Sequence, residues 1–159
     1  MYSYLLGQYI FKEIIEIIRH EDADAVLVAG DIYDKSQPSA EAVALCDDFF
    51  YSLSGLDKDI FIISGNHDCP ERIAYGARLL ENTKFHIAPV FNGEMKRTEL
   101  FDEFGKVNVY MLPFVISGRA YLHLNIADVL LLPLASPYNA YVIPSKIVVL
   151  PAPVSPVIR

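Results

Sequence analysis

The chain contains few cysteines and no excess of positive charge. Its two cysteines, Cys46 and Cys69, are too few for a disulfide framework or a zinc cluster, and we expect both to be free thiols in a reducing compartment. Lysine and arginine number 13 against 20 aspartates and glutamates, which gives a formal net charge of −7. This balance argues against a basic nucleic-acid-binding surface. An acidic enzyme can still act on phosphates when bound metal ions supply the positive charge.

Long uninterrupted hydrophobic runs are also absent. No stretch reaches about 18 apolar residues, so no membrane span is expected. A signal peptide needs a basic start and an uninterrupted apolar segment. The first residues are not basic, and Lys12, Glu13 and Glu16 interrupt the apolar positions. We therefore expect no signal peptide and a cytoplasmic protein. With 159 residues, of which 53% are hydrophobic, the chain is long enough for one domain with a packed core.

The pattern of apolar residues predicts alternating helices and strands. Residues 4–20 place apolar side chains at helical spacing between charged ones, which predicts an amphipathic helix. Residues 25–29 and 60–63 are short continuous apolar runs, typical of parallel strands covered on both faces, and the second strand is expected over residues 59–64. Residues 39–53 between them predict a second helix. This order indicates an α/β fold with a right-handed parallel layer.

Further elements are predicted before residue 115. A third helix is expected from Pro70 to about residue 80, because proline fits the first turn of a helix. Residues 84–90 and 107–113 are predicted to be strands. Residues 92–106 are polar and contain glycines, which indicates a loop or a hairpin between them.

The composition changes after residue 115. The last 159 − 115 = 44 residues contain six of the ten prolines and only one acidic residue, Asp128. Proline at this density excludes a long helix and interrupts the hydrogen-bond ladder of a sheet. We therefore predict that residues 1–115 form a partial domain. Residues 116–159 are predicted to be an apolar, proline-rich tail that is not native to this fold.

Two short polar motifs follow the first two predicted strands. The first is Gly-Asp-Ile-Tyr-Asp at residues 30–34, and the second is Gly-Asn-His-Asp at residues 65–68. Open α/β sheets bind their ligands beyond the carboxyl ends of the strands. A carboxylate such as Asp31 can bridge two divalent cations about 3.5–4 Å apart, and Asn66 offers a neutral oxygen ligand beside it.

His67 and Asp34 supply the remaining predicted chemistry. His67 can protonate the leaving oxygen when a phosphodiester breaks, and Asp34 could accept a hydrogen bond from His67 and hold its tautomer. Either motif alone is more often a turn, because Gly, Asp and Asn favour turn conformations. Together, on consecutive strands, they predict metal ligands at Asp31 and Asn66 and catalytic residues at His67 and Asp34.

These motifs resemble those of a known family. They are similar to the second and third motifs of the calcineurin-like metallophosphoesterases. Residues 24–34, 38–42, 62–72 and 107–114, which contain and flank the motifs, resemble the SbcD family of bacterial nuclease subunits. The resemblance covers about residues 3–115 and implies a partial metallophosphoesterase sandwich. It also implies a manganese-dependent DNA exonuclease and endonuclease that acts on double-strand ends and hairpins. DNA and an SbcC-type ATPase are the implied partners, in a heteromeric complex.

Parts of the family pattern do not occur in this chain. The family opens with an Asp-x-His motif on a first strand, and neither precedes the first predicted helix here. The family also uses a later histidine and a Gly-His-x-His motif, whereas His86 and His123 stand in other contexts, with a structural role favoured for His86. Two ligands cannot hold two hard cations in octahedral geometry. We therefore expect an incomplete Mn²⁺ site and a chain that is inactive alone.

The codons that can encode the tail suggest where the tail comes from. Suitable codons for residues 134–158, read on the complementary strand with a shift of one base, encode a Gly-x-x-x-x-Gly-Lys-Thr phosphate-binding loop. Such a loop resembles the start of the SbcC-type ATPase. This relationship indicates an inversion or an assembly join that places an antisense segment of a partner gene in frame, so we expect no chemistry from the tail.

Two other functions remain open from the sequence. The chain could be a small phosphodiesterase or phosphatase of the same superfamily, since the two motifs do not distinguish these from a nuclease. It could also be a non-catalytic fragment that presents a partner-binding surface. The side chain of Tyr33 could line a substrate groove or pack inside the domain, and Cys69 is most simply a small residue before Pro70.

Overall fold

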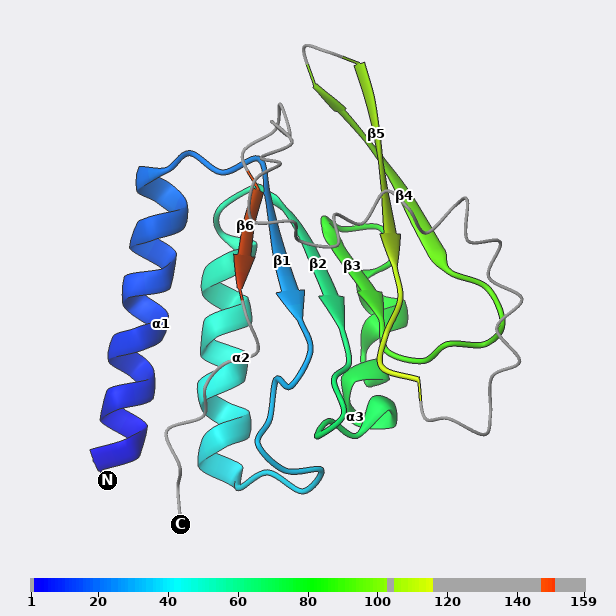
Figure 1. Ribbon diagram of the computed structural model, residues 1–159. Helices are drawn as coiled ribbons and strands as arrows, with labels where there is room; N and C mark the ends of the chain where they lie inside the picture. Colours follow the sequence, from blue (N-terminus) through cyan, green and yellow to red (C-terminus); the bar gives the residue numbers. More distant parts are fainter. Residues whose placement is uncertain (1, 103–104, 116–146, 151–159) are drawn as a thin grey trace, which may run out of the picture.

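The computed structural model describes residues 2–102, 105–115 and 147–150 (Figure 1). Within these residues the chain alternates helices and strands up to β3 and then forms a hairpin. The elements in chain order are α1 (Tyr2–His20), β1 (Ala25–Ala29), α2 (Ala40–Ser54), β2 (Asp59–Ile63), α3 (Pro70–Ala74), the 3₁₀ helix η1 (Ala77–Leu80), β3 (Phe85–Ala88), β4 (Lys96–Asp102), β5 (Gly105–Met111) and β6 (Ile147–Leu150).

Two sheets form, one parallel and one antiparallel. The parallel sheet has the strand order β3-β2-β1-β6, and β4 pairs with β5 in an antiparallel hairpin. In the parallel sheet Ala25 lies opposite Asp59, and Ile60 lies opposite Phe85. The α/β fold class predicted from the sequence is confirmed, and the strand from Ala25 to Ala29 has the predicted bounds.

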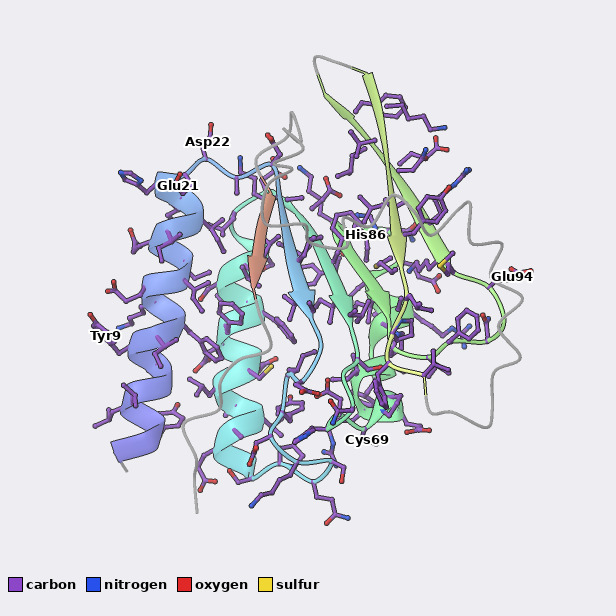
Figure 2. The ribbon with its side chains drawn as sticks, in the orientation of Figure 1. Tyr9, Glu21, Asp22, Cys69, His86 and Glu94 are labelled. Carbon is purple, nitrogen blue, oxygen red and sulfur yellow. The ribbon has the colours of Figure 1, made fainter. Side chains whose placement is uncertain are left out.

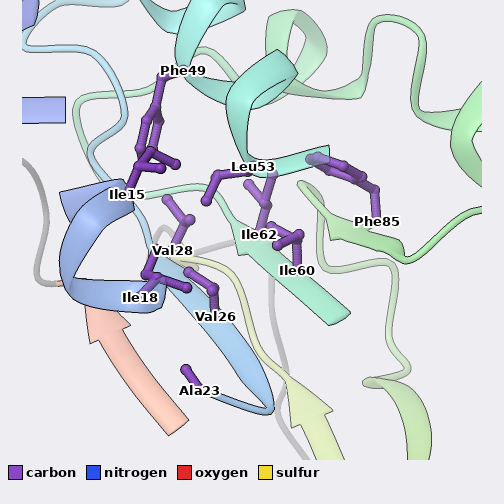
Figure 3. Packing of buried hydrophobic residues seen from close by; sticks show 10 residues of the cluster. All are labelled: Ile15, Ile18, Ala23, Val26, Val28, Phe49, Leu53, Ile60, Ile62 and Phe85. Carbon is purple, nitrogen blue, oxygen red and sulfur yellow. The ribbon is translucent and has the colours of Figure 1, made fainter. Parts of the chain in front are cut away.

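The larger hydrophobic core lies between the parallel sheet and the two long helices. Figure 3 shows Ile18 of α1 and Leu53 of α2 packed toward the side chains of β1 and β2, including Val26 and Ile60. These four side chains are essentially removed from water. Each fully buried side chain of this size contributes about 1.5–3 kcal/mol relative to an exposed one, so this face holds the helices on the sheet.

A smaller core joins the other face of the parallel sheet to the hairpin. Met111 of β5 packs with Ala25, Phe61 and Ala88, which alternate along their strands with the residues of the larger core. Side chains of a strand point alternately to its two faces. The continuous apolar runs of β1 and β2 therefore match a sheet that is covered on both sides, as the sequence predicts.

The third helix is shorter than predicted. The sequence predicts one helix from Pro70 to about residue 80, but α3 ends at Ala74 and η1 follows as a separate turn. Gly76 between them has φ of 78°, a left-handed conformation that cannot continue a right-handed helix. The prediction of a single helix is therefore wrong, because Tyr75 is already extended, with ψ of 122°, and Gly76 follows in the left-handed region.

The tail contains a strand that its composition did not lead us to expect. Ile147–Leu150 forms β6 and pairs in parallel with β1, so that Val26 lies opposite Val148. The four residues are branched, apolar and free of proline, whereas Pro144 and Pro151 stand on either side. Such a segment can donate and accept the ladder hydrogen bonds that proline would prevent. The other residues of the predicted tail lie outside the described part of the chain.

The described helices include none that could cross a membrane, as judged by their length and apolar content.

Candidate functional site

The two polar motifs meet at one edge of the parallel sheet. Because β1 and β2 are parallel, the loops after Ala29 and Ile63 leave the sheet at the same end. Figure 2 shows Cys69, which follows the second motif, at this end of the strands. Gly30 and Asp31 both have positive φ values, 88° and 46°, so the chain turns sharply as it leaves β1.

Two glycines allow the loops to touch through their backbones. A Cβ atom on Gly30 would lie 2.8 Å from the backbone nitrogen of Gly65, which is closer than real Cβ atoms approach. A Cβ atom on Gly65 would collide with the backbone nitrogen and the carboxylate of Asp31. Glycine is therefore required at Gly65 by the close approach of the loops, and at Gly30 also by its positive φ.

A hydrogen bond joins the predicted metal ligand of the first loop to the second loop. Oδ1 of Asp31 accepts the backbone N–H of His67 at 3.0 Å. The residue before His67 is Asn66, whose side chain is exposed. The structure thus brings Asp31, Asn66 and His67 to one place, although Asp31 and His67 are 36 residues apart in the sequence.

The buried carboxylate of Asp68 holds both loops. Its Oδ2 accepts the backbone N–H groups of Gly65 at 2.8 Å and Ile32 at 3.1 Å, and its Oδ1 accepts that of Tyr33 at 3.0 Å. Asp68 is only 7% exposed. Charge-assisted hydrogen bonds of this kind are about twice as strong as neutral ones.

Asp68 has no role among the sequence-based predictions. An aspartate three residues after Gly65 could have indicated a turn in which the side chain caps a nearby backbone N–H. The two bonds to the loop after β1 could not be foreseen, because they depend on the two strand ends lying side by side.

His67 contacts Asp34, but through the backbone. The Nδ1 atom of His67 lies 2.9 Å from the carbonyl oxygen of Asp34. A carbonyl cannot donate, so Nδ1 carries the proton and Nε2 remains for other partners. The prediction that the Asp34 carboxylate holds His67 is corrected: its carbonyl oxygen makes the contact, because Asp34 lies in an exposed loop that turns its backbone toward the ring.

The surroundings of His67 favour its protonated form. The carbonyl of Asp34 accepts the ring N–H, and the carboxylates of Asp31, Asp34 and Asp68 lie near it; together these raise the pKa of His67 above the ordinary 6.5. The imidazole is fully exposed, so solvent screens these charges. A raised pKa with an accessible ring suits a group that donates a proton near neutral pH.

An open hollow lies beside these residues. It measures about 450 Å³, and its lining includes Asp31, Ser64 and Asn66. The segment that follows β5, residues 112–115, also lines it. Ligand sites usually combine an apolar wall with a few polar groups, so the hollow could receive a ligand next to the two motifs.

Tyr33 packs inside the domain instead of lining this hollow. Its half-buried side chain lies close enough to the thiol of Cys46 on α2 for the two groups to interact. Burial raises the pKa of Cys46 to about 11 and also raises the pKa of Tyr33. Of the two roles open to Tyr33 from the sequence, the structure favours packing, with the side chain between the first loop and α2.

Both cysteines are free thiols, as predicted. Cys46 is buried in the packing of α2, whereas Cys69 is partly exposed just before α3. The Sγ atom of Cys69 lies 3.3 Å from Oε2 of Glu71 in the first turn of that helix. Cys69 therefore contacts its own helix start.

His86 lies apart from the motifs. Figure 2 shows it on β3, away from the end of the sheet where Cys69 lies. Its Nε2 is 2.6 Å from Oδ1 of Asp59, and its ring stacks on Phe61 with the centroids 4.6 Å apart. These contacts agree with the predicted structural role. His123 lies outside the described residues.

The described residues do not fit a two-metal centre by themselves. Within residues 2–102, 105–115 and 147–150, no three side chains of His, Cys, Asp or Glu gather as metal ligands. Both oxygens of Asp68 already accept backbone N–H groups. Asp31 and Asn66 remain as oxygen donors, and hard divalent cations take about six ligands each. The incomplete metal site stays a prediction.

Comparison with known proteins gives the family. The model of the calcineurin-like phosphoesterase family matches residues 7–141. The SbcD subunit of the SbcCD nuclease from Staphylococcus saprophyticus subsp. saprophyticus is 32% identical over 107 residues, which are 67% of this chain and 27% of that protein. The chain thus spans little more than a quarter of that relative's length. Because the family model matches most of this chain, the chain belongs to the calcineurin-like phosphoesterases, a family of hydrolases that use divalent metal ions.

Proposed function

We propose that this chain contributes to phosphodiester hydrolysis in a DNA nuclease subunit of the SbcD type. Such a subunit would act as an exonuclease on double-strand ends and as an endonuclease on single strands and hairpins. The observation that carries the proposal is the hydrogen bond from the His67 backbone to Asp31, which places a carboxylate, an amide and an imidazole together. The 32% identity to the SbcD subunit of a nuclease supports DNA as the substrate.

Each residue of the site has a distinct proposed role. Asp31 and Asn66 would donate oxygen ligands to Mn²⁺, which supplies the positive charge that a phosphate needs in this acidic chain. His67 binds the Asp34 carbonyl through Nδ1, so its Nε2 is the atom that would give a proton to the leaving oxygen. Since the described residues hold too few donors for two ions, we expect the chain to be inactive alone.

The proposal includes a partner and a compartment. An SbcC-type ATPase subunit would join this chain in a heteromeric complex in the cytoplasm. The net charge of −7 supports the need for such a partner, because an acidic chain repels the phosphates of DNA.

A chimera tests the nuclease function directly. Residues 7–115 would replace the matching region of the Staphylococcus saprophyticus protein, whose remaining chain supplies the missing segments. We expect Mn²⁺-dependent cleavage of a DNA hairpin by this chimera. Its Asp31→Asn variant should lose at least about 100-fold in rate, whereas Asp48→Asn on the exposed face of α2 should not. Hydrolysis of bis-p-nitrophenyl phosphate without cleavage of DNA would favour the small phosphodiesterase instead.

Calorimetry with the unaltered chain tests the incomplete site. Titration with MnCl₂ should show weak binding, reduced further by Asp31→Asn. Tight binding of two ions per chain would contradict the incomplete site.

A further inference from the structure

We propose that the ring of Phe114 is a stacking platform for a nucleobase of the substrate, next to the site of Asp31 and Asn66. This proposal rests on the proposed nuclease function and names the part of the substrate that the open hollow receives. It predicts that the chain prefers nucleic acid with an unpaired base, such as a frayed end or the loop of a hairpin.

The lining of the hollow combines two kinds of residue. Asp31 and Asn66 carry the oxygen atoms of the proposed metal site. Phe114 lines the same hollow, together with Leu112, Pro113 and Val115. A nucleotide has the same division, since a charged phosphate is linked through a sugar to a flat aromatic base. The arrangement therefore matches a nucleotide better than a ligand that is polar or apolar throughout.

Phe114 is held in place although its ring is exposed. Its backbone N–H donates to the carbonyl of Ser64 at 2.9 Å. Ser64 is 1% exposed and its hydroxyl donates to the carbonyl of Pro89 at 2.6 Å. Ser64 directly precedes Gly65 and Asn66, so Phe114 is tied to the same loop that carries the proposed ligand. Phe114 is 54% exposed, so its ring is available to a ligand.

Base stacking would let this chain bind nucleic acid without attracting its phosphates. With a net charge of −7 the protein has little electrostatic attraction for phosphates. Stacking of a base on an aromatic side chain does not depend on charge and tolerates any base, because every base has a flat aromatic face. Removing one such ring typically weakens single-strand binding by about 5- to 150-fold.

The absence of tryptophan from the chain allows a direct test. The chain contains no Trp, so Phe114→Trp places a single reporter at the hollow. A matched control is Phe101→Trp, because Phe101 is also an exposed phenylalanine, at 76%, but lies on β4 of the hairpin. An oligothymidylate at physiological ionic strength, where salt screens the repulsion between the acidic chain and the phosphates, should quench the fluorescence of the Phe114→Trp variant in a saturable manner and leave that of the Phe101→Trp variant unchanged. An abasic oligonucleotide with the same phosphates should quench neither variant.

A second pair of variants guards against a misfolded reporter. Binding of labelled oligothymidylate, followed by fluorescence anisotropy, should weaken about tenfold in Phe114→Leu and be retained in Phe114→Tyr. Equal quenching by the abasic oligonucleotide, equal quenching of both tryptophan variants, quenching of neither, or unchanged binding by Phe114→Leu would overturn the stacking proposal. The chimera keeps the two proposals separate: cleavage of DNA without stacking overturns only the platform, and stacking without cleavage overturns only the nuclease.

Discussion

The carboxylate of Asp68 accepts the backbone N–H of Tyr33 at 3.0 Å, across 35 residues of sequence. The same carboxylate binds Ile32 in the first loop and Gly65 in its own loop. One buried acidic side chain thus sets the distance between the loops that carry Asp31 and Asn66. A site of this kind depends on its backbone being held in place before any ligand arrives.

Replacing Asp68 by Asn should loosen both loops. The amide has one acceptor oxygen instead of two and turns an NH₂ group toward a backbone N–H, so at least one of the three bonds is lost. We expect the free energy of unfolding to fall by about 1–3 kcal/mol, measured by urea denaturation. Asp48→Asn on the exposed side of α2 is the control and should change stability by less than about 0.5 kcal/mol. Equal stability of both variants would contradict the role of Asp68.

Replacing Gly65 by Ala should force the loops apart. The added methyl group would collide with the backbone of Asp31, which cannot rotate away as a flexible side chain could. The expected cost is about 1–3 kcal/mol, as for other overpacked positions, read from thermal unfolding. Gly55→Ala is a matched control, because its Cβ would lie 3.5 Å from the nearest atom, the carbonyl oxygen of Ser52. If Gly65→Ala is as stable as Gly55→Ala, the close contact between Gly65 and the backbone of Asp31 is contradicted.

The titration of His67 should report its contacts with the first loop. In the metal-free chain, NMR of the ring proton should give a pKa above 6.5, and Asp31→Asn should lower it because one of the negative charges that favour the imidazolium is removed. A raised folded-state pKa stabilises the fold fully below the unfolded value. This contribution is lost as the pH rises through the higher value of the folded state. The same midpoint in both proteins would show that Asp31 does not act on the ring.

The two cysteines should differ in reactivity. Burial raises the pKa of Cys46 from 9.0 to about 11, whereas Cys69 is partly exposed. Iodoacetamide at pH 8 should alkylate Cys69 at least about tenfold faster in the folded chain, with both reacting in urea. Mass spectrometry of the peptides measures this directly. Because the folded pKa is the higher one, Cys46 should also cost stability as the pH rises from about 9 to 11. Equal alkylation rates in the folded chain would contradict the burial of Cys46.

The local elements were largely readable from the residues. The apolar runs of β1 and β2 predicted two buried parallel strands, because only a strand covered on both faces is apolar at every position. The start of α2 was also predictable, since Ser39 caps the helix through its side chain, which accepts the N–H of Ala42 at 3.2 Å. Gly76 was misread within a helix, because its left-handed conformation could be recognised only from the fold around it.

Contacts between distant segments needed the tertiary structure. Nothing in the local pattern indicated that four proline-free residues of the tail would pair with β1, since strand pairing depends on which sheet edge is open. The hydrogen bond between His67 and the carbonyl of Asp34 was also out of reach, because it depends on the path of the backbone.

By itself the sequence determined the α/β class and the identity of the two motifs, because both follow from residue types at short spacing. The tertiary structure alone decided how those motifs are held: by the carboxylate of Asp68, by the glycine contact at Gly65, and beside the exposed ring of Phe114. The physical reason is the parallel pairing of β1 and β2. This pairing brings together two loops that are far apart in the sequence. The interactions that position the loops form only between them, so they exist only in the folded chain.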